Sequence, residues 1–358
     1  MSPSVLVAGY TTRHVAKSAA RAGYDVYAVD HFCDQDLLWC TKDVMAFDEL
    51  DELPFALEEM LARHQIDCVV TTSGAELLEV PNRLGTAPEV AARFMDKGKT
   101  QEFFESLGVP VPRKLSDGEY PAMMKTLSGA GGWRNAVVRN DAERACWEEF
   151  AEHEPFLMQE VIAGVPASVS CVGTGTAAKA VAANEQILRG GDSCAYAFSG
   201  SVTPCTHPMT RRMMAVAEKI VAASGCVGSV GVDFVLTDTE AYAIEVNPRF
   251  QGTVETVEGA TEVNLFQLHA DACRGILPDA VPEPGQFCVR KILAAPEPLV
   301  MRADMRDLAG TITDIPHPGT VFEEGEVMFS VLGCGPSRDE AFVSLDKHIT
   351  GAVQHIKT

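Results

Sequence analysis

The sequence predicts an α/β domain with a small parallel sheet at the N-terminus, followed by a larger region of α+β character. Over residues 1–95, short apolar strands alternate with amphipathic helices, which is the pattern of βαβ units. From about residue 120 the pattern changes to hairpins mixed with helices, and a Pro- and Gly-rich segment occupies 276–290. We therefore expect three parts, covering residues 1–95, 96–275 and 276–358.

The N-terminal elements follow in order. Three apolar runs predict the parallel strands: SVLVA (4–8), DVYAV (25–29) and DCVVT (67–71). Between the first two, Thr11 or Thr12 can cap a helix that ends at Gly23. Before the third strand, apolar side chains at helical spacing predict a second helix: Leu53, Leu57, Met60 and Leu61. Ligands of such sheets bind at the carboxyl ends of the strands.

The central elements begin with a helix over about 97–107, which starts after Asp96 and stops at Gly108. Two hairpins follow: YPAMMK with AVVRN around a glycine-rich loop, and GVDFVL with AYAIEV around a short turn. A helix is expected at 210–224. A last helix is opened by a capping box that Ser337 and Glu340 form.

Composition excludes several classes of protein. The chain has 29 basic and 50 acidic residues, and its net charge of -21 disfavours nucleic acid and anionic membrane surfaces as partners. It has no apolar run of membrane-spanning length and no export signal at MSPSVLVAGY, so we expect a cytoplasmic protein. The eleven cysteines include no CxxC pair, which predicts reduced, mostly buried thiols.

The second hairpin predicts a metal site. If residues 238–240 form its turn, Asp233 lies opposite Glu245, and Asn247 follows on the same face because strand side chains repeat every two residues. Two carboxylates and an amide without His or Cys suit a hard cation such as Mg²⁺. The alternative is a pair of ordinary solvent-facing strand residues.

Phosphate ligands are expected upstream. Lys125 ends a strand and precedes a glycine-rich loop whose backbone N–H groups can approach an anion closely. The loop is not a P-loop, since GxxxxGK[ST] is absent, and a plain flexible turn is the alternative. Lys97 is a second candidate cation. The strand FLMQEVIAG (156–164) turns polar at Gln159 and Glu160 and could present backbone groups to an adenine.

The N-terminal βαβ unit, with Asp30 at the end of its second strand, also raises the alternative of a nicotinamide-dependent dehydrogenase. Its first turn, AGYTTRH, holds one glycine where the dinucleotide fingerprint needs three, which disfavours that reading. We interpret the strand-end segments Gly9-Tyr10-Thr11 and TTSGAE, with Ser73 and Glu76, as part of a substrate site; simple turn chemistry is the alternative.

Taken in order, four motifs resemble those of the ATP-grasp superfamily: DKGKTQEFFESLGVPVPR, MMKTLSGAGG, FLMQEVIAG and GVDFVLTDTEAYAIEVNPR. The N-terminal VLVAGYTTRHVAKSAARAGYDVYAVDHFCDQD resembles the Rossmann-like domain that precedes the grasp. Including DIPHPGTVFEEGE, the chain looks most like the carboligase-like branch related to carbamoyl phosphate synthetase and biotin carboxylase. The resemblance implies a pre-ATP-grasp domain, a two-lobed ATP-grasp fold and a C-terminal subdomain packing on it.

The resemblance also implies roles for particular residues. Arg249 and Lys125 would be catalytic, and Mg²⁺, or Mn²⁺ in its place, would bind Asp233, Glu245 and Asn247. ATP would be held by phosphate ligands, a closing loop and an adenine-reading hinge: Lys97, Lys125, Gly129, Gly131, Gly132, Gln159, Glu160, Val161 and Ile162. The chain departs from the family at GVPASVS, where a ribose-binding glutamate is common, and Ser168 and Ser170 disfavour a biotin or bicarbonate reaction.

The function expected on these grounds is that of a carboxylate-amine ligase. It would activate a carboxylate as an acyl phosphate, join it to an amine such as an amino acid, and release ADP and phosphate. The alternatives are a tyramine-glutamate-type ligase of cofactor biosynthesis and a non-catalytic ATP-binding protein, besides the disfavoured dehydrogenase. The expected partners are small-molecule substrates, with a homodimer as a reasonable assembly.

Overall fold

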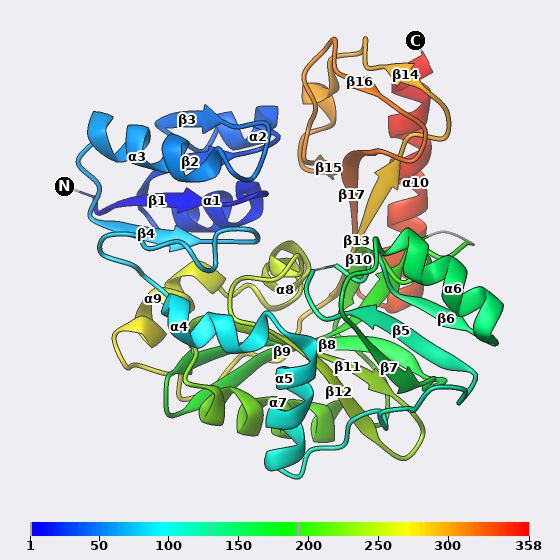
Figure 1. Cartoon of the computed structure of the whole chain (residues 1–358). Coiled ribbons are helices and arrows are strands. Elements are labelled where there is room, and N and C mark those ends of the chain that lie inside the picture. The colour runs from blue at the N-terminus through cyan, green and yellow to red at the C-terminus, as the bar shows by residue number, and fades with distance from the viewer. Residues whose placement is uncertain (1, 130, 192–193, 358) are drawn as a thin grey trace.

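Four parallel strands form the N-terminal sheet, drawn in blue in Figure 1, in the order β3-β2-β1-β4. The computed structural model describes residues 2–129, 131–191 and 194–357. The strands are β1 (Ser4–Ala8), β2 (Asp25–Asp30), β3 (Asp43–Ala46) and β4 (Cys68–Thr71). Three of them were predicted. The sequence analysis missed β3, because DVMA is short and has no fully buried side chain to give it a strong apolar pattern.

The helices of this part are α1 (Arg13–Arg21), α2 (Gln35–Leu38) and α3 (Leu53–Arg63). Thr12, rather than Thr11, is the residue before α1, and Gly23 has a positive φ of 88° just after its end. The apolar stripe predicted for α3 packs against the sheet through Leu53, Leu57 and Met60. The predicted βαβ arrangement is therefore confirmed.

A helical linker joins this domain to the rest of the chain. It comprises α4 (Pro88–Ala91), the short 3-10 helix η1 (Ala92–Phe94) and α5 (Lys97–Ser106). The Asp96 carboxylate caps α5 by accepting hydrogen bonds from Gly98 N and Lys99 N at 2.8 and 3.0 Å. Lys97 is thus fixed as the first residue of the predicted helix.

The first predicted hairpin lies in a small three-stranded sheet of order β6-β5-β7. Its strands are β5 (Ala122–Thr126), β6 (Ala136–Val138) and β7 (Phe156–Glu160). The helix α6 (Asp141–Phe150) lies between β6 and β7 in the chain. Both β6 and β7 run antiparallel to β5, and Lys125 pairs with Leu157. Trp147 of α6 and Met124 of β5 lie in the core beneath this sheet.

The large sheet has eight strands in the order β12-β11-β8-β9-β10-β13-β17-β15, and each neighbouring pair is antiparallel. The first five strands in chain order are β8 (Val165–Thr174), β9 (Ala178–Leu188), β10 (Phe198–Thr203), β11 (Val227–Leu236) and β12 (Ala241–Asn247). The predicted helix α7 (Thr210–Ser224) packs on one face through Met213 and Ile220. Helices α8 (Val254–Thr261) and α9 (Leu265–Cys273) pack on the other, in one core with α1.

The C-terminal segment joins the same sheet. Its strands are β13 (Phe287–Ala294), β15 (Ile312–Thr313) and β17 (Val327–Gly335); β14 (Leu299–Val300), β16 (Val321–Phe322), the 3-10 helix η2 (Met305–Leu308) and α10 (Arg338–Lys357) complete it. Glu340 N bonds Ser337 Oγ, which in turn donates to the Glu340 carboxylate, at the start of α10. Because β13 pairs with β10, the division at residue 276 cuts a continuous sheet, and the three-part division stays a proposal.

Two cysteines differ from the sequence-based expectation. Cys288 and Cys334 face each other across β13 and β17 and form a disulfide, so the expectation that all eleven cysteines are reduced is wrong for this pair. Each strand holds an unremarkable single cysteine, and their pairing depends on a register between segments 46 residues apart.

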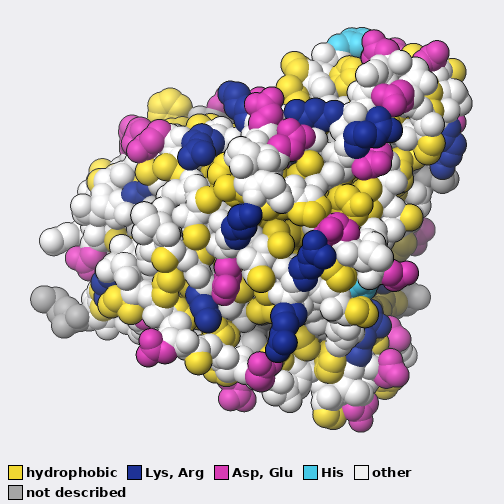
Figure 2. Space-filling model, turned by 90° about the horizontal axis from the view of Figure 1, so that it is seen from below, with side chains coloured by type: hydrophobic (Ala, Val, Ile, Leu, Met, Phe, Trp, Pro, Cys, Tyr) yellow, Lys and Arg dark blue, Asp and Glu magenta, His cyan; other side chains and the backbone are white. Residues whose placement is uncertain are grey.

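Charged side chains of both signs lie among hydrophobic ones on the face seen in Figure 2, so neither sign dominates that face despite the net charge of -21. Among the residues that the structure describes, no helix combines the length and apolar character needed to cross a membrane.

Candidate active site

A cavity of about 290 Å³ opens between the three-stranded sheet and the large sheet. Ten of the residues singled out from the sequence line it: Lys125, Gly131, Gly132, Gln159, Glu160, Ile162, Asp233, Glu245, Asn247 and Arg249. An adjoining cavity of about 260 Å³ shares the wall at Gly132 and Asn135 and is lined by Lys97 and Gly129. Val161 is the predicted residue that lines neither of them, within the part of the chain described.

The predicted pairing in the second hairpin is present. Asp233 lies opposite Glu245 on β11 and β12, and Gly231 lies opposite Asn247. Asn247 Nδ2 donates to Asp233 Oδ2 at 3.1 Å, so the three predicted oxygen-bearing side chains converge at one end of the hairpin. Among the described residues, no group of three or more His, Cys, Asp or Glu side chains is arranged to hold a metal; this group has two carboxylates and an amide.

Two glutamines that the sequence analysis did not assign hold Asp233. Gln186 Nε2 of β9 and Gln251 Nε2 each donate to Asp233 Oδ1, at 3.0 and 2.8 Å. A Cβ on Gly231 would lie 1.8 Å from Gln251 Cδ, so a glycine at 231 makes room for that side chain. The polar run Asn-Glu-Gln after the apolar segment AVAA of β9 was the available signal for Gln186.

The Asp233 carboxyl group has a raised pKa. Burial, together with the charge of Glu245, raises the pKa of Asp233 to about 7. Gln251 Oε1 is buried and has no hydrogen-bond partner among the described residues. An unpaired carbonyl oxygen beside two carboxylates is an environment that favours a hard cation. The residues present therefore fit Mg²⁺.

The two predicted lysines lie close to this group, Lys125 on β5 of the three-stranded sheet and Lys97 at the start of α5. Lys125 is 6% exposed, and burial lowers its pKa to about 8 despite the neighbouring acidic groups. Lys97 Nζ donates to Gly129 O at 2.6 Å and lies 3.9 Å from Glu245 Oε1. The two lysines thus lie near the two carboxylates, which is the charge pattern that an anionic ligand with a bound cation needs.

The glycine-rich loop bends over the cavity. Gly129, Gly131 and Gly132 all have positive φ, and Phe198 N donates to Gly131 O at 3.0 Å. A Cβ on Gly132 would lie 2.4 Å from Tyr196 O. The glycine-rich loop therefore approaches the backbone at Tyr196 more closely than a side chain at residue 132 would allow. Ala130 lies outside the described residues.

Side-chain hydrogen bonds hold Gln159 and Glu160 of β7. Gln159 is 4% exposed, and its Nε2 donates to Gln101 Oε1 of α5 at 2.9 Å. Glu160 is tied to the preceding connector, since its carboxylate accepts from Arg113 N at 2.8 Å. Ile162 lies just beyond and contributes an apolar surface to the cavity.

Arg249 connects the cavity to the N-terminal domain. Its Nε donates to Glu76 Oε1 at 2.7 Å, and its Nη1 donates to Phe250 O at 2.9 Å. Glu76 comes from the TTSGAE segment after β4, so this strand-end segment does reach the cavity wall. Ser73 contributes its carbonyl, which accepts from Tyr10 N at 2.7 Å.

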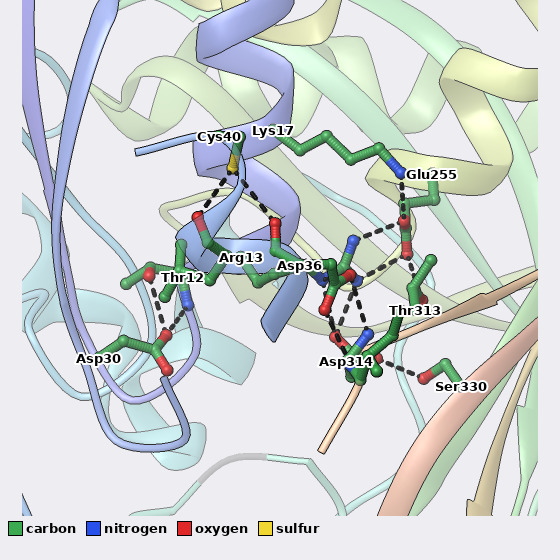
Figure 3. A network of polar contacts seen from close by, with 12 residues as sticks. Thr12, Arg13, Lys17, Asp30, Asp36, Cys40, Glu255, Thr313, Asp314 and Ser330 are labelled. Atoms are coloured by element: carbon green, nitrogen blue, oxygen red, sulfur yellow. Dashed lines mark hydrogen bonds and ion pairs between the residues drawn. The ribbon is translucent and has the colours of Figure 1, made fainter. Parts of the chain in front are cut away.

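Behind the cavity, a buried ionic network joins all three parts of the chain (Figure 3). Arg13 of α1 is 1% exposed; its Nη atoms donate to both carboxylate oxygens of Glu255 in α8, at 2.6 and 2.8 Å. Its Nε donates to Asp314 Oδ1 at 2.9 Å. Arg290 of β13 also bonds Asp314, at 2.7 Å, and donates to Gly252 O at 3.2 Å on the cavity wall.

Comparisons with known proteins agree with this geometry. A family model described as an ATP-grasp domain matches residues 94–253. An uncharacterized protein of Methanocaldococcus jannaschii is 25% identical, over 91% of this chain and 87% of its own length. The arginine-specific carbamoyl phosphate synthase large chain of Lactiplantibacillus plantarum is 23% identical over 85% of this chain. The chain spans 33% of that synthase.

Solved structures show the same fold. The L-amino acid ligase of Bacillus licheniformis aligns with a TM-score of 0.73 at 15% identity, over 98% of this chain and 97% of its own. The biotin carboxylase domain dimer of the Hydrogenobacter thermophilus 2-oxoglutarate carboxylase, in complex with MgADP, ADP and bicarbonate, aligns with a TM-score of 0.75 at 14% identity. That alignment covers 98% of this chain and 90% of the other.

Proposed function

Since residues 94–253 form an ATP-grasp domain, we propose that the protein is an ATP- and Mg²⁺-dependent ligase that joins a carboxylate to an amine. The observation that carries the proposal is the convergence of Lys125, Asp233, Glu245, Asn247 and Arg249 on one cavity between two sheets. The likeness to the L-amino acid ligase supports an amide-forming reaction. The substrates would be small molecules, and a homodimer would be its assembly.

In the first step, a carboxylate oxygen of the substrate would attack the γ-phosphorus of ATP, and ADP would leave. Lys125 and Lys97 would bind the phosphates, since Lys125 lines the cavity and Lys97 lines the adjoining one. Asp233, Glu245 and Asn247 would hold Mg²⁺, which would offset the negative charge of the phosphate groups. Gln186 and Gln251 would position Asp233 for this role.

In the second step, the amine nitrogen would attack the carbonyl carbon of the acyl phosphate. The C–N bond would form, the C–O bond to phosphate would break, and the departing phosphate would take the proton that leaves the nitrogen. Arg249 would stabilise the negative charge that develops on the carbonyl oxygen. The glycine-rich loop would exclude water, which otherwise hydrolyses the acyl phosphate. Its contact with Phe198 supports such a closure.

The test is substrate-dependent ADP release in a screen of carboxylate and amine pairs. Glu245→Gln and Lys125→Ala should each lower the turnover by at least about a hundredfold, as expected for loss of transition-state charge stabilisation. Lys99→Ala is the matched control, because Lys99 is an exposed lysine two residues from Lys97. Wild-type ATP consumption by Glu245→Gln or Lys125→Ala in the presence of substrates would refute the proposal.

A further inference from the structure

A cluster of buried polar side chains joins the large sheet to the start of α8. Its members come from β8, β9, β10 and the first turn of the helix, and each is at most 6% exposed: Ser168, Ser170, Asn184, Thr203, Thr253 and Thr256. Burial of a hydroxyl or amide group costs free energy unless the group is hydrogen-bonded. Each member of this polar cluster therefore needs a partner for its donors and acceptors.

Hydrogen bonds inside the polar cluster fix the orientation of the Asn184 amide. Thr203 Oγ1 donates to Asn184 Oδ1 at 2.6 Å. Asn184 Nδ2 donates to the hydroxyl oxygens of Ser168 and Ser170, at 3.3 and 3.2 Å. The reversed amide would have one acceptor among the described residues for the two hydrogens of its nitrogen, in a side chain that is fully buried. Asn184 is therefore the donor to Ser170.

The same reasoning continues from Ser170 to the wall of the cavity. Ser170 Oγ lies 3.0 Å from Thr253 Oγ1, and within the part of the chain described its other hydrogen-bond neighbour is Asn184 Nδ2. If Thr253 were the donor, the buried Ser170 hydrogen would have no acceptor, which costs free energy. If Ser170 is the donor, the Thr253 hydrogen is left for a molecule in the cavity, since Thr253 lines the cavity and Ser170 does not. Thr253 therefore offers a hydroxyl hydrogen to the cavity.

This hydroxyl is not used to cap the helix. Thr253 is the residue before α8, where a threonine side chain commonly accepts a hydrogen bond from the first turn, but its side chain makes no such bond. Its backbone carbonyl accepts from Val257 N at 3.0 Å and from Thr256 Oγ1 at 3.0 Å. The backbone is thus held in place while the hydroxyl is oriented by Ser170 alone.

The position of Thr253 indicates which molecule it contacts. Arg249, Gln251 and Thr253 line the same cavity, and Gln251 connects this stretch to the candidate metal site through Asp233. In the reaction proposed above, Arg249 faces the reacting carboxyl group. A hydroxyl hydrogen bonds an oxygen acceptor, whereas an ammonium group has N–H donors and no acceptor. A carboxylate oxygen beside Arg249 therefore fits the Thr253 hydroxyl, and an ammonium group does not.

We propose that the Thr253 hydroxyl binds an oxygen of the carboxylate substrate and that Ser170 and Asn184 orient it. The inference rests on the proposed ligase function and adds a second donor for the group that Arg249 faces. The hydrogen bond persists in the acyl phosphate, whose carbonyl oxygen gains negative charge when the amine attacks. Thr253 is a substrate-binding residue, and Ser170 and Asn184 are positioning residues.

The experiment is hydroxamate formation by the full-length protein from MgATP, hydroxylamine and one carboxylate at a time, with the standard L-amino acids and acetate as the panel. Hydroxylamine takes the place of the amine: its nitrogen attacks the carbonyl carbon of the acyl phosphate, and phosphate leaves with the proton. The carboxylate used for kinetics is the most active one in this panel or in the screen of pairs above. The readout therefore requires no knowledge of the amine.

Thr253→Val should raise the KM for the carboxylate about tenfold, because valine keeps the shape of threonine and loses one hydrogen bond to a charged group. The KM for ATP should change less than about twofold, since uniform binding of the nucleotide is not affected. Thr253→Ser should bring the KM for the carboxylate back to within about threefold of the wild-type value, because it restores the donor. A purely structural role of Thr253 would not give this selectivity.

Ser170→Ala tests the orientation of the hydroxyl. It should raise the KM for the carboxylate about threefold in the wild-type background and leave it unchanged in the Thr253→Val background, because both residues act through one hydrogen bond. Thr261→Val is the matched control. Thr261 also lies on α8 and is buried, but its hydroxyl donates to Val257 O and it does not line the cavity, so the KM should not change.

An unchanged KM for the carboxylate in Thr253→Val, or no recovery in Thr253→Ser, overturns this inference. An equal rise in the KM for ATP overturns it as well, because the hydroxyl would then contact a phosphate group. A different result is the absence of hydroxamate with every carboxylate together with no ADP release in the screen of pairs. That result overturns the ligase function itself.

Discussion

Replacement of Arg13 by Met should cost the protein a large part of its stability. The Arg13 guanidinium is buried against Asp36, Glu255 and Asp314, at 3.4, 2.6 and 2.8 Å (Figure 3). Methionine fills a similar volume but leaves three buried carboxylates, of which Glu255 and Asp314 still pair with Arg290 at 3.3 and 2.7 Å. Removal of one partner from a buried ion pair typically costs about 3–5 kcal/mol, and we expect a loss in that range at pH 7.

The loss should depend on pH in a direction that follows from the pKa values. Burial alone would raise the pKa of Glu255, but the charge and hydrogen bonds of Arg13, together with the charge of Arg290, outweigh burial and lower the pKa to about 2. The same opposition holds the pKa of Asp314 below its usual range. Between about pH 2 and 4.5, the unfolded wild-type protein binds more protons at Glu255 than the folded protein does. The stabilisation that ionised Glu255 contributes is therefore fully present above pH 4.5 and is lost as the pH falls. Without Arg13 the buried carboxyls take up protons in the folded state, and the deficit of the variant should shrink between pH 7 and pH 5.

Urea unfolding followed by far-UV circular dichroism at pH 7 and pH 5 measures the loss of stability in Arg13→Met and its change with pH. Arg63→Met is the control, because Arg63 and Glu59 form a pair on α3 that is about half exposed on both sides, and such pairs contribute at most about 1 kcal/mol. A deficit below about 1 kcal/mol for Arg13→Met, or one that is as large at pH 5 as at pH 7, would show that the network is not held by this arginine.

Three further predictions concern the cavity and the disulfide. Gly231→Ala should displace Gln251 and cost about 1–3 kcal/mol in urea unfolding, and Gln251→Ala in the same chain should recover part of the loss; additive effects would contradict the contact. MgADP should raise the melting temperature, and EDTA should remove most of that rise; an equal rise with ADP alone would argue against the metal site. Denatured, unreduced protein should titrate nine thiols of its eleven cysteines, and reduction of Cys288–Cys334 should lower stability by about 2–4 kcal/mol; eleven thiols without reductant would disprove the bond.

Local patterns predicted much of the architecture. The alternation of apolar residues in β1, β2 and β4, the spacing in α3 and the cap at Asp96 each depend on neighbours within a few residues, and the structure agrees with them. The pairing of Asp233 with Glu245 was predicted, but the turn alone does not produce it. Leu236 pairs with Ala241 beside the turn, and a register shift between Asp233 and Phe234 brings Asp233 opposite Glu245. The strand β3 gave too weak a local signal.

The sequence by itself determined which chemical groups the site can offer: the two lysines, the carboxylates with Asn247, the glycine-rich loop and Arg249, each recognisable from its local motif. The tertiary structure decided how these groups are held. Gln186 reaches Asp233 from a separate strand, Glu76 reaches Arg249 across 173 residues, and Arg13 meets Asp314 across 301. No local rule specifies such contacts, because they arise when distant segments bury their polar groups against each other and each buried charge requires a partner.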